Sequence, residues 1–277
     1  MVALGYSDTD ALLAVGVKPV GIVDWFQVPP ANNTWSWEEQ AFGGTVPEVV
    51  GVRDEYDLEK VAALRSDLVV AAYSGMSEEQ SNPLSQITKV VAQPVGFEPF
   101  AAPWQALTTQ ITKAVGQEAR GRELVAGVER KIADARSAHP EWVGQTAVTA
   151  AYGGGQYFAF TAGDPKTDLL TQLGFTIPAE LDAPRQGGTA MVSAERVDLL
   201  DVDKLVWVLS TAADEAEVRA RPEYAAMPVA QQDRALFLLT EERQKALAAA
   251  FSYNSVLSLP YVVDQLAPQL ADLPPAT

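Results

Sequence analysis

The side chains of this chain that could bind a ligand are mostly aromatic, and they lie in stretches that we expect to be loops. Open α/β sheets bind ligands beyond the carboxyl ends of their strands, where such loops lie. For Trp25 and Trp37 the alternative is that they only anchor an insertion to its own lobe. The candidates, each in a stretch that follows a predicted strand, are Trp25, Trp35, Trp37, Tyr73, Trp104, Tyr152, Tyr157 and Tyr253.

A catalytic site is not indicated. The chain has no Cys, which excludes thiol catalysis, Cys-ligated zinc, iron–sulfur clusters and disulfides. Its one His, His139, precedes Pro140 at a predicted helix end, and no acidic motif offers a metal site. The run Gly153-Gly154-Gly155 lacks a phosphate-loop pattern, so we interpret it as a turn. We predict no catalytic residue, no metal site and no cofactor.

Two acidic residues occupy matching places in the chain. The stretches from Leu58 to Val70 and from Ala194 to Val206 share Glu, a basic residue, Val, Leu, Asp and Val at one spacing, with Glu59 matching Glu195. The pattern predicts a short helix leading into a strand, used twice, and therefore two related lobes. Each Glu could be a solvated acid of a first helical turn. A symmetric pair could also be gripped by a basic, two-fold partner.

The remaining pattern predicts an α/β fold of two lobes. Apolar runs alternate with helical stretches, which implies parallel sheets covered by helices, and Leu124, Val128 and Ile132 mark one long helix over 118–137. We expect an N-terminal lobe over 1–115, a connecting helix over 116–140 and a C-terminal lobe over 141–277. The net charge of −16 argues against a nucleic-acid partner.

The order of these motifs resembles the class III solute-binding proteins of ABC importers, which deliver iron siderophores, haem or cobalamin. The matching stretches are 2–5, 12–21, 50–51, 58–71, 169–175, 193–196 and 259–270. The resemblance implies two Rossmann-like lobes joined by one long backbone helix, and one Glu per lobe, at Glu59 and Glu195, that docks on a permease dimer. It also implies an extracytoplasmic protein, periplasmic or lipid-anchored to the outer face of the membrane, whose signal segment is not in this chain. A further departure is Arg65-Ser66-Asp67, where the family usually has Lys-Pro-Asp.

From these observations we predict a monomeric binding protein for a ferric siderophore. Arg185 is the best candidate cation to face the ligand and Arg53 a weaker one. With few such cations, a neutral or cationic hydroxamate-type or mixed siderophore is favoured over an anionic tricatecholate. Haem or cobalamin is the alternative ligand. A two-lobed Rossmann-type enzyme or an adhesive protein are the alternatives from other classes.

Overall fold

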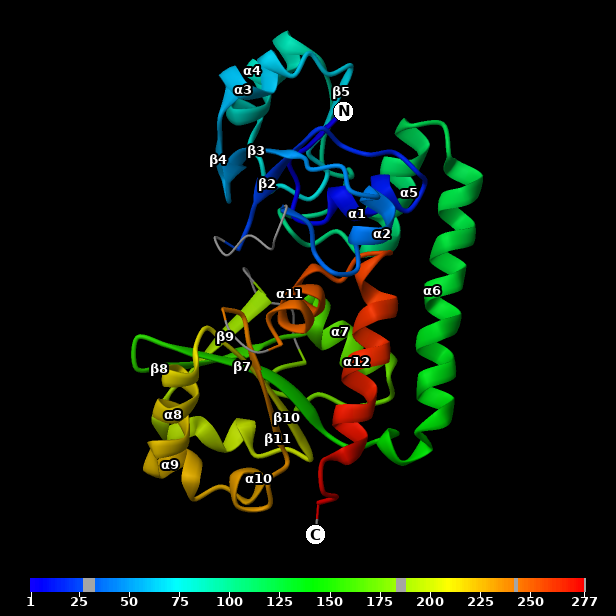
Figure 1. The fold of residues 1–277 in the computed structure, drawn as a ribbon. Coiled ribbons are helices and arrows are strands. Elements are labelled where there is room, and N and C mark those ends of the chain that lie inside the picture. Colours follow the sequence, from blue (N-terminus) through cyan, green and yellow to red (C-terminus); the bar gives the residue numbers. More distant parts are fainter. Residues whose placement is uncertain (27–32, 183–187, 242–243, 277) are drawn as a thin grey trace. The chain divides into compact units, whose positions relative to one another are not determined.

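The computed structural model describes residues 1–26, 33–182, 188–241 and 244–276, and these form two compact units (Figure 1). The first unit contains Met1–Val128 and Tyr253–Pro260, and the second contains Glu129–Ser252 and Tyr261–Thr277. The boundary falls within α6 (Glu118–Ala138) and α12 (Ser258–Asp272), and before the last residue of α11 (Lys245–Tyr253). The predicted long helix over 118–137 is confirmed.

The first unit is built on a six-stranded sheet in the order β4-β3-β2-β1-β5-β6. All neighbouring strands are parallel except β4, which is antiparallel to β3. The elements are β1 (Val2–Ala3), α1 (Asp8–Leu13), β2 (Gly21–Asp24), α2 (Glu39–Phe42), β3 (Glu48–Val52), β4 (Glu55–Tyr56), α3 (Leu58–Ala63), β5 (Leu68–Val70), α4 (Glu78–Ile87), β6 (Lys89–Val91) and α5 (Trp104–Ala114).

The second unit is built on a five-stranded sheet in the order β11-β10-β7-β8-β9. Its elements are η2 (Pro140–Trp142), β7 (Ala147–Gly153), β8 (Gln156–Phe160), α7 (Pro165–Gln172), β9 (Thr189–Val192), η4 (Ala194–Leu200), β10 (Lys204–Leu209), α8 (Ala212–Ala220), α9 (Pro222–Ala225), α10 (Pro228–Gln231), β11 (Ala235–Leu239) and α11 (Lys245–Tyr253).

The second sheet is mixed. Strands β7, β10 and β11 are parallel, whereas β8 and β9 run antiparallel to their neighbours. The cause is the glycine run: Gly154 and Gly155 have φ angles of 59° and 78°, which suits a two-residue hairpin that turns the chain straight back. The predicted turn at this run is confirmed, and so is the α/β fold with parallel strands in both sheets.

Side chains alternate between the two faces of each sheet, and helices pack against the apolar side chains of a face. In β10, Leu205, Trp207 and Leu209 point to one face, where they pack with Val218 of α8 and Tyr224 of α9. In the first unit, Val61 of α3 and Leu84 of α4 pack with the apolar side chains of β1, β2, β3 and β5. Across the described residues, no helix has both the length and the apolar character that crossing a membrane requires.

Candidate functional site

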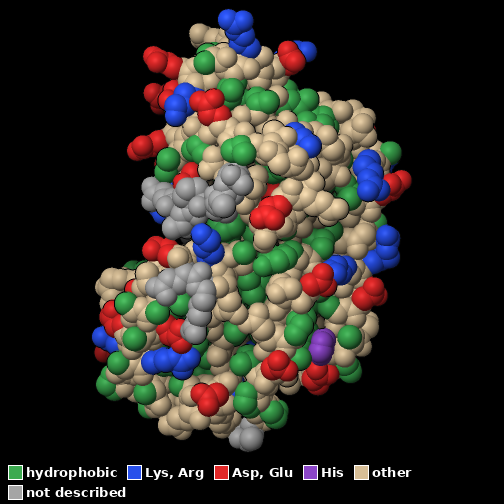
Figure 2. Space-filling model, in the orientation of Figure 1, with side chains coloured by type: hydrophobic (Ala, Val, Ile, Leu, Met, Phe, Trp, Pro, Cys, Tyr) green, Lys and Arg blue, Asp and Glu red, His purple; other side chains and the backbone are tan. Residues whose placement is uncertain are grey.

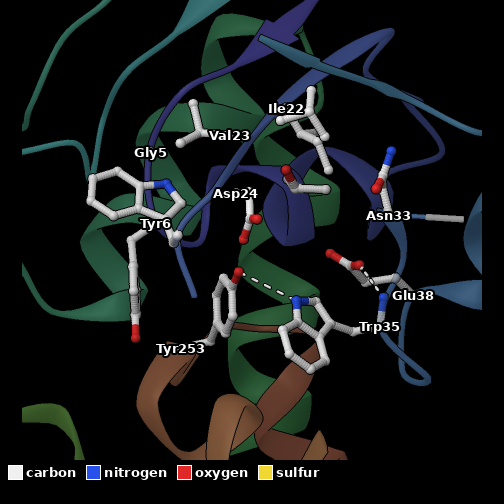
Figure 3. A pocket seen from close by; sticks show the side chains of 12 residues that line it. Gly5, Tyr6, Ile22, Val23, Asp24, Asn33, Trp35, Glu38 and Tyr253 are labelled. Carbon is white, nitrogen blue, oxygen red and sulfur yellow. Dashed lines mark hydrogen bonds between the residues drawn. The ribbon is translucent and has the colours of Figure 1, made fainter. Parts of the chain in front are cut away.

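A pocket lined by aromatic side chains lies in the first unit, beyond the carboxyl ends of β1 and β2 (Figure 3). Gly5 and Tyr6 follow β1, and Trp25 follows β2, so two neighbouring parallel strands end at this place, as the rule for open α/β sheets requires. The described lining residues are Gly5, Tyr6, Thr9, Ile22, Val23, Asp24, Trp25, Asn33, Trp35, Glu38, Val49 and Tyr253.

Gly5 is required where β1 ends. A Cβ atom at this position would lie 2.2 Å from a carboxylate oxygen of Asp8. That carboxylate is buried and accepts hydrogen bonds from the backbone N–H groups of Gly5, Ala72 and Tyr73, at 2.9, 2.9 and 3.1 Å. Asp8 therefore ties the end of β1 to the loop after β5, and it holds the strand end from which Tyr6 extends.

Stacked and edge-on aromatic rings form the pocket wall. The rings of Tyr6 and Tyr253 stack with their centroids 4.7 Å apart, and Trp25 lies edge-on to Tyr6 at 5.4 Å. The indole N–H of Trp35 donates to the hydroxyl of Tyr253 at 3.3 Å, as Figure 3 shows. The indole nitrogen of Trp25 is buried and has no acceptor among the described residues.

The carboxyl groups are the charge-bearing side chains of the described lining. Asp24 and Glu38 line the pocket, and the lining residues that the structure describes include no Lys or Arg. Burial raises the pKa of Glu38 well above its usual range, and the nearby charge of Asp10 raises it further. Burial likewise raises the pKa of the Tyr253 hydroxyl well above its ordinary value. Burial thus disfavours the charged forms of both Glu38 and Tyr253 in this pocket.

Three of the predicted ligand residues, Trp25, Trp35 and Tyr253, line this pocket. Chain order suggested a place in the second lobe for Tyr253, but it belongs to the first unit because the chain returns there over Tyr253–Pro260. Trp37 and Tyr73 are not lining residues but contact them: Trp37 stacks on Trp35 with centroids 5.2 Å apart, and Tyr73 lies edge-on to Tyr6 at 6.2 Å.

Other predicted residues lie away from this pocket. Trp104 is half-buried at the start of α5 and is not a lining residue. Arg185 lies outside the described residues. Arg53 is exposed, and its backbone N–H donates to the carbonyl oxygen of Asp24 at 3.0 Å, so its backbone adjoins the pocket strand β2.

Tyr152 and Tyr157 face each other across the β7–β8 hairpin of the second unit, with ring centroids 5.1 Å apart. Their rings are buried in the core of that unit. Their hydroxyls donate to carboxylates, that of Tyr152 to Glu217 at 2.6 Å and that of Tyr157 to Glu223 at 3.2 Å. The structure thus brings the two tyrosines together, each with its hydroxyl bonded to a glutamate, Glu217 or Glu223.

Glu59 and Glu195 have matching positions. Each is the second residue of a short helix, α3 or η4, and that helix precedes the parallel strand β5 or β10. Both side chains are exposed, and neither forms a hydrogen bond or ion pair with the part of the chain that the structure describes. Both carboxylates are therefore available to a partner.

Several site residues escaped the sequence analysis. Tyr6, Asp24, Asn33 and the buried Glu38 line the pocket, and the buried Asp10 accepts from the indole N–H of Trp37. The position of Tyr6 and Asp24 at the ends of predicted strands is a signal that could have identified them. His139 stacks on Trp142 and contacts Glu141. In the described ranges no group of three His, Asp or Glu side chains could hold a metal ion.

Comparison with known proteins gives consistent matches. Residues 1–241 match the model of the family described as periplasmic binding protein. A probable siderophore-binding lipoprotein of Bacillus subtilis, YfiY, is 26% identical over 178 residues, which are 64% of this chain and 52% of that protein. The chain thus spans about half the length of this curated relative.

Two solved structures resemble nearly the whole chain. A periplasmic solute binding protein from Mycobacterium smegmatis has 32% identity and a TM-score of 0.86, and the match covers 98% of this chain and 92% of that one. PiaA of Streptococcus pneumoniae in complex with ferrichrome has 22% identity and a TM-score of 0.81, with the same coverage. The predicted resemblance to solute-binding proteins is confirmed, and the chain belongs to the periplasmic binding protein family.

Proposed function

We propose that this protein captures a ferric siderophore of hydroxamate or mixed-ligand type and delivers it to an ABC importer. Membership of the binding-protein family supports capture without chemistry on the ligand. The name of the B. subtilis relative and the ferrichrome in the S. pneumoniae complex support an iron siderophore as the ligand. Iron arrives as part of this ligand, so the proposal assigns the protein no cofactor of its own.

The side chains that line the aromatic pocket are the observation that favours one class of siderophore over another. Asp24 and Glu38 line the pocket without a described Lys or Arg among its lining residues. Three hydroxamates neutralise Fe³⁺, whereas three catecholates leave a complex with about three negative charges, which a low-dielectric lining without a described Lys or Arg would not compensate. A neutral or cationic complex therefore fits this lining better. Trp25 supplies a buried N–H for a carbonyl or hydroxamate oxygen.

The size of the pocket defines how the ligand would be held. It leaves about 30 Å³ for the centres of water molecules, which is room for about two of them. A whole siderophore cannot enter such a space, so the ligand would lay one edge on the rings of Trp25, Tyr6 and Tyr253. Tyr152, Tyr157 and Arg185 remain candidate contacts from the second unit, and Trp37, Tyr73 and Trp104 would act behind the contact surface.

Delivery to a permease would use the two matched acids. Glu59 and Glu195 are exposed and available, one from each unit, and such a pair suits a permease dimer with basic side chains. Acidic and basic side chains both occur on the face that Figure 2 shows, with no broad basic area there. We propose a monomer that works outside the cytoplasm, periplasmic or tethered to the outer face of the membrane.

Tryptophan fluorescence tests the ligand class, because Trp25 and Trp35 line the pocket. Ferric ferrichrome and ferrioxamine should quench the emission saturably at micromolar concentration, and a ferric tricatecholate should bind at least about tenfold more weakly. Free tryptophan with the same ligands corrects for their absorbance. Tighter binding of the tricatecholate, or of haemin or cobalamin, would overturn the proposal, as would an absence of saturable quenching by every hydroxamate.

A further inference from the structure

Four aromatic side chains follow four neighbouring strands of the first sheet, one after each strand. Trp25 follows β2, Tyr6 follows β1, Tyr73 follows β5, and Phe100 lies between β6 and α5. These strands are adjacent in the order β2-β1-β5-β6 and run parallel, so their carboxyl ends lie together, where open α/β sheets bind ligands. Two of the four side chains, Tyr6 and Trp25, also line the aromatic pocket.

The four rings contact one another in a closed cycle, which we call the aromatic box. The ring centroids lie 5.4 Å apart between Tyr6 and Trp25, and 6.0 Å apart between Trp25 and Phe100. They lie 5.5 Å apart between Phe100 and Tyr73, and 6.2 Å apart between Tyr73 and Tyr6. All four pairs are edge-on, which is an arrangement that aromatic rings favour. Because each ring packs against two others, the aromatic box forms one continuous surface.

Phe100 is held in a backbone conformation that phenylalanine rarely adopts. Its φ angle is 60°, in the left-handed region. The hydroxyl of Tyr73 donates to the carbonyl oxygen of Phe100 at 2.9 Å. The ring of Phe100 lies against Gly75, where a Cβ atom would be 2.1 Å from it. Such a conformation persists where the surrounding contacts enforce it, and it occurs most often at functional sites such as ligand clamps.

Phe100 is also the most exposed of the two rings that carry the box away from the pocket. It is 42% exposed, whereas Tyr73 is 6% exposed. If Phe100 served only to anchor its loop, burial of the whole ring would stabilise the fold most, and a left-handed backbone would work against that role. A strained and partly exposed ring that adjoins a pocket residue, Trp25, instead suits a surface that a ligand covers.

We propose that Phe100 contacts the ligand and determines specificity, and that the aromatic box binds the hydrocarbon part of the ligand. The inference rests on the proposed function of the aromatic pocket. Only one edge of a siderophore fits that pocket, so the rest of the ligand must lie on neighbouring residues, and Phe100 adjoins Trp25. A phenyl ring has no polar atom, so it recognises the chains that join the iron-binding groups and not the iron centre itself.

Substitutions at Phe100 separate the ring from its backbone. Phe100→Ala removes the ring, and Phe100→Gly also relieves the backbone, because Gly adopts a φ angle of 60° freely. By calorimetry, both variants should bind ferrioxamine about fivefold more weakly, since the exposed part of one Phe ring loses its contact. Wild-type affinity in Phe100→Gly would show that the ring does not contact the ligand.

The matched control for these variants is Phe97→Ala. Phe97 lies in the same stretch of chain and is 40% exposed, but it is not part of the aromatic box. Its substitution should change the affinity for ferrioxamine within about twofold, as is usual at a surface position. An equal loss of affinity in Phe97→Ala and Phe100→Ala would overturn the inference, because exposure of an aromatic ring in this loop would then explain both.

Gly75 tests the position of the ring without removing it. In Gly75→Ala the new Cβ atom must displace the ring of Phe100, so ferrioxamine should bind at least about threefold more weakly. Gly116→Ala is the control for backbone strain, because the φ angles are 63° at Gly75 and 72° at Gly116, and no atom lies within 4 Å of a Cβ at Gly116. The same affinity in both variants would contradict the proposed contact.

Two ferric ligands with the same iron centre test which part of the ligand the box recognises. Ferrioxamine joins its three hydroxamates by hydrocarbon chains, whereas ferric tris(acetohydroxamate), kept in excess acetohydroxamic acid, has no such chains. The preference of the protein for ferrioxamine over the chain-free complex should fall about fivefold in Phe100→Ala. An unchanged preference would overturn the assignment of the box to the hydrocarbon part.

The inference and the proposed function fail in different ways. Far-ultraviolet circular dichroism checks that each variant is folded. If wild type binds ferrioxamine and a folded Phe100→Ala protein binds it equally well, the inference is wrong and the proposed function stands. If wild type binds no ferric hydroxamate, the proposed function is wrong, and the inference that rests on it is wrong as well.

Discussion

The two units use the same pair of groups, tyrosine and glutamic acid, in opposite ways. In the first unit, Tyr253 accepts from an indole N–H and lies near Glu38, whose pKa is raised well above its usual range by burial. In the second unit, Tyr157 donates to the partly exposed Glu223, which also pairs with Arg221 at 2.9 Å. The backbone N–H of Glu223 and the Arg221 guanidinium hold the pKa of Glu223 below its usual range.

From this difference we expect burial, and not residue type, to decide which unit discriminates ligand charge. Glu38 is 4% exposed and pairs with no Lys or Arg among the described residues, so a negative charge of the ligand would stay uncompensated there. Around Glu223 water and Arg221 screen the carboxylate, so the same residue type places little demand on a ligand. What the units share is the exposed acid at the start of a short helix, Glu59 in one and Glu195 in the other.

The largest expected effect, on cellular uptake, comes from reversing the charge of the matched acids Glu59 and Glu195. In the double variant Glu59→Lys/Glu195→Lys, uptake of radio-iron ferrichrome by cells should be abolished, because cationic groups of a permease would meet Lys in both units. The dissociation constant for ferrichrome should not change. The control is Glu79→Lys/Glu241→Lys, which reverses one exposed acid in each unit outside the matched positions. Normal uptake by the first double variant would show that the matched acids are only solvated residues of a helix start.

A smaller effect on the free energy of unfolding compares the buried carboxylate of Asp8 with the partly exposed carboxylate of Asp203. Asp8→Ala leaves three backbone N–H groups without an acceptor in the core of the first unit, which should cost about 3 kcal/mol or more of unfolding free energy. Asp203→Ala removes the bonds of Asp203 to Thr146 in the second unit, where the side chain is partly exposed and water can replace it, for about 1 kcal/mol.

Hydrogen exchange of peptides from each unit would measure these costs separately. Burial raises the pKa of Asp8 to about 7, so its stabilising contribution is complete at acid pH and is lost as pH rises through that value. The cost of Asp8→Ala should therefore be larger at about pH 5 than at about pH 8. A cost that is equal at both pH values, or no larger than that of Asp203→Ala, would contradict the contrast between the two environments.

Periodic patterns in the sequence predict the regular elements well. The helix Glu118–Ala138 coincides with the predicted range, because apolar residues there recur at one clear period. The antiparallel β8 and β9 were not predicted, since alternation of strands and helices does not show the direction in which a hairpin sends the chain. The short strand β3 in the first unit also has no strong pattern.

The site is less predictable than the fold, because its key contacts join distant parts of the chain. Asp10 looks like a helix-start acid in the sequence, and only folding brings Trp37 and Ser255 to it. Tyr253 follows the second lobe in chain order, yet it belongs to the first unit. The aromatic loops were predictable because strand ends are local features, whereas the burial of Asp10 and Glu38 is a product of tertiary packing.

The smallest expected effect, on ferrichrome affinity, compares the loss of one tyrosine hydroxyl in each unit, that of Tyr253 and that of Tyr152. Tyr253→Phe keeps the ring that stacks on Tyr6 but leaves the indole N–H of Trp35 without its acceptor in a buried place, so ferrichrome should bind about fivefold more weakly, equivalent to about 1 kcal/mol. Tyr152→Phe releases Glu217 to water and keeps the ring, so its effect should be within about twofold. Titration calorimetry resolves both changes. If Tyr152→Phe weakens binding as much as Tyr253→Phe, the tyrosine hydroxyls of the second unit discriminate the ligand too, and burial alone does not decide where selectivity lies.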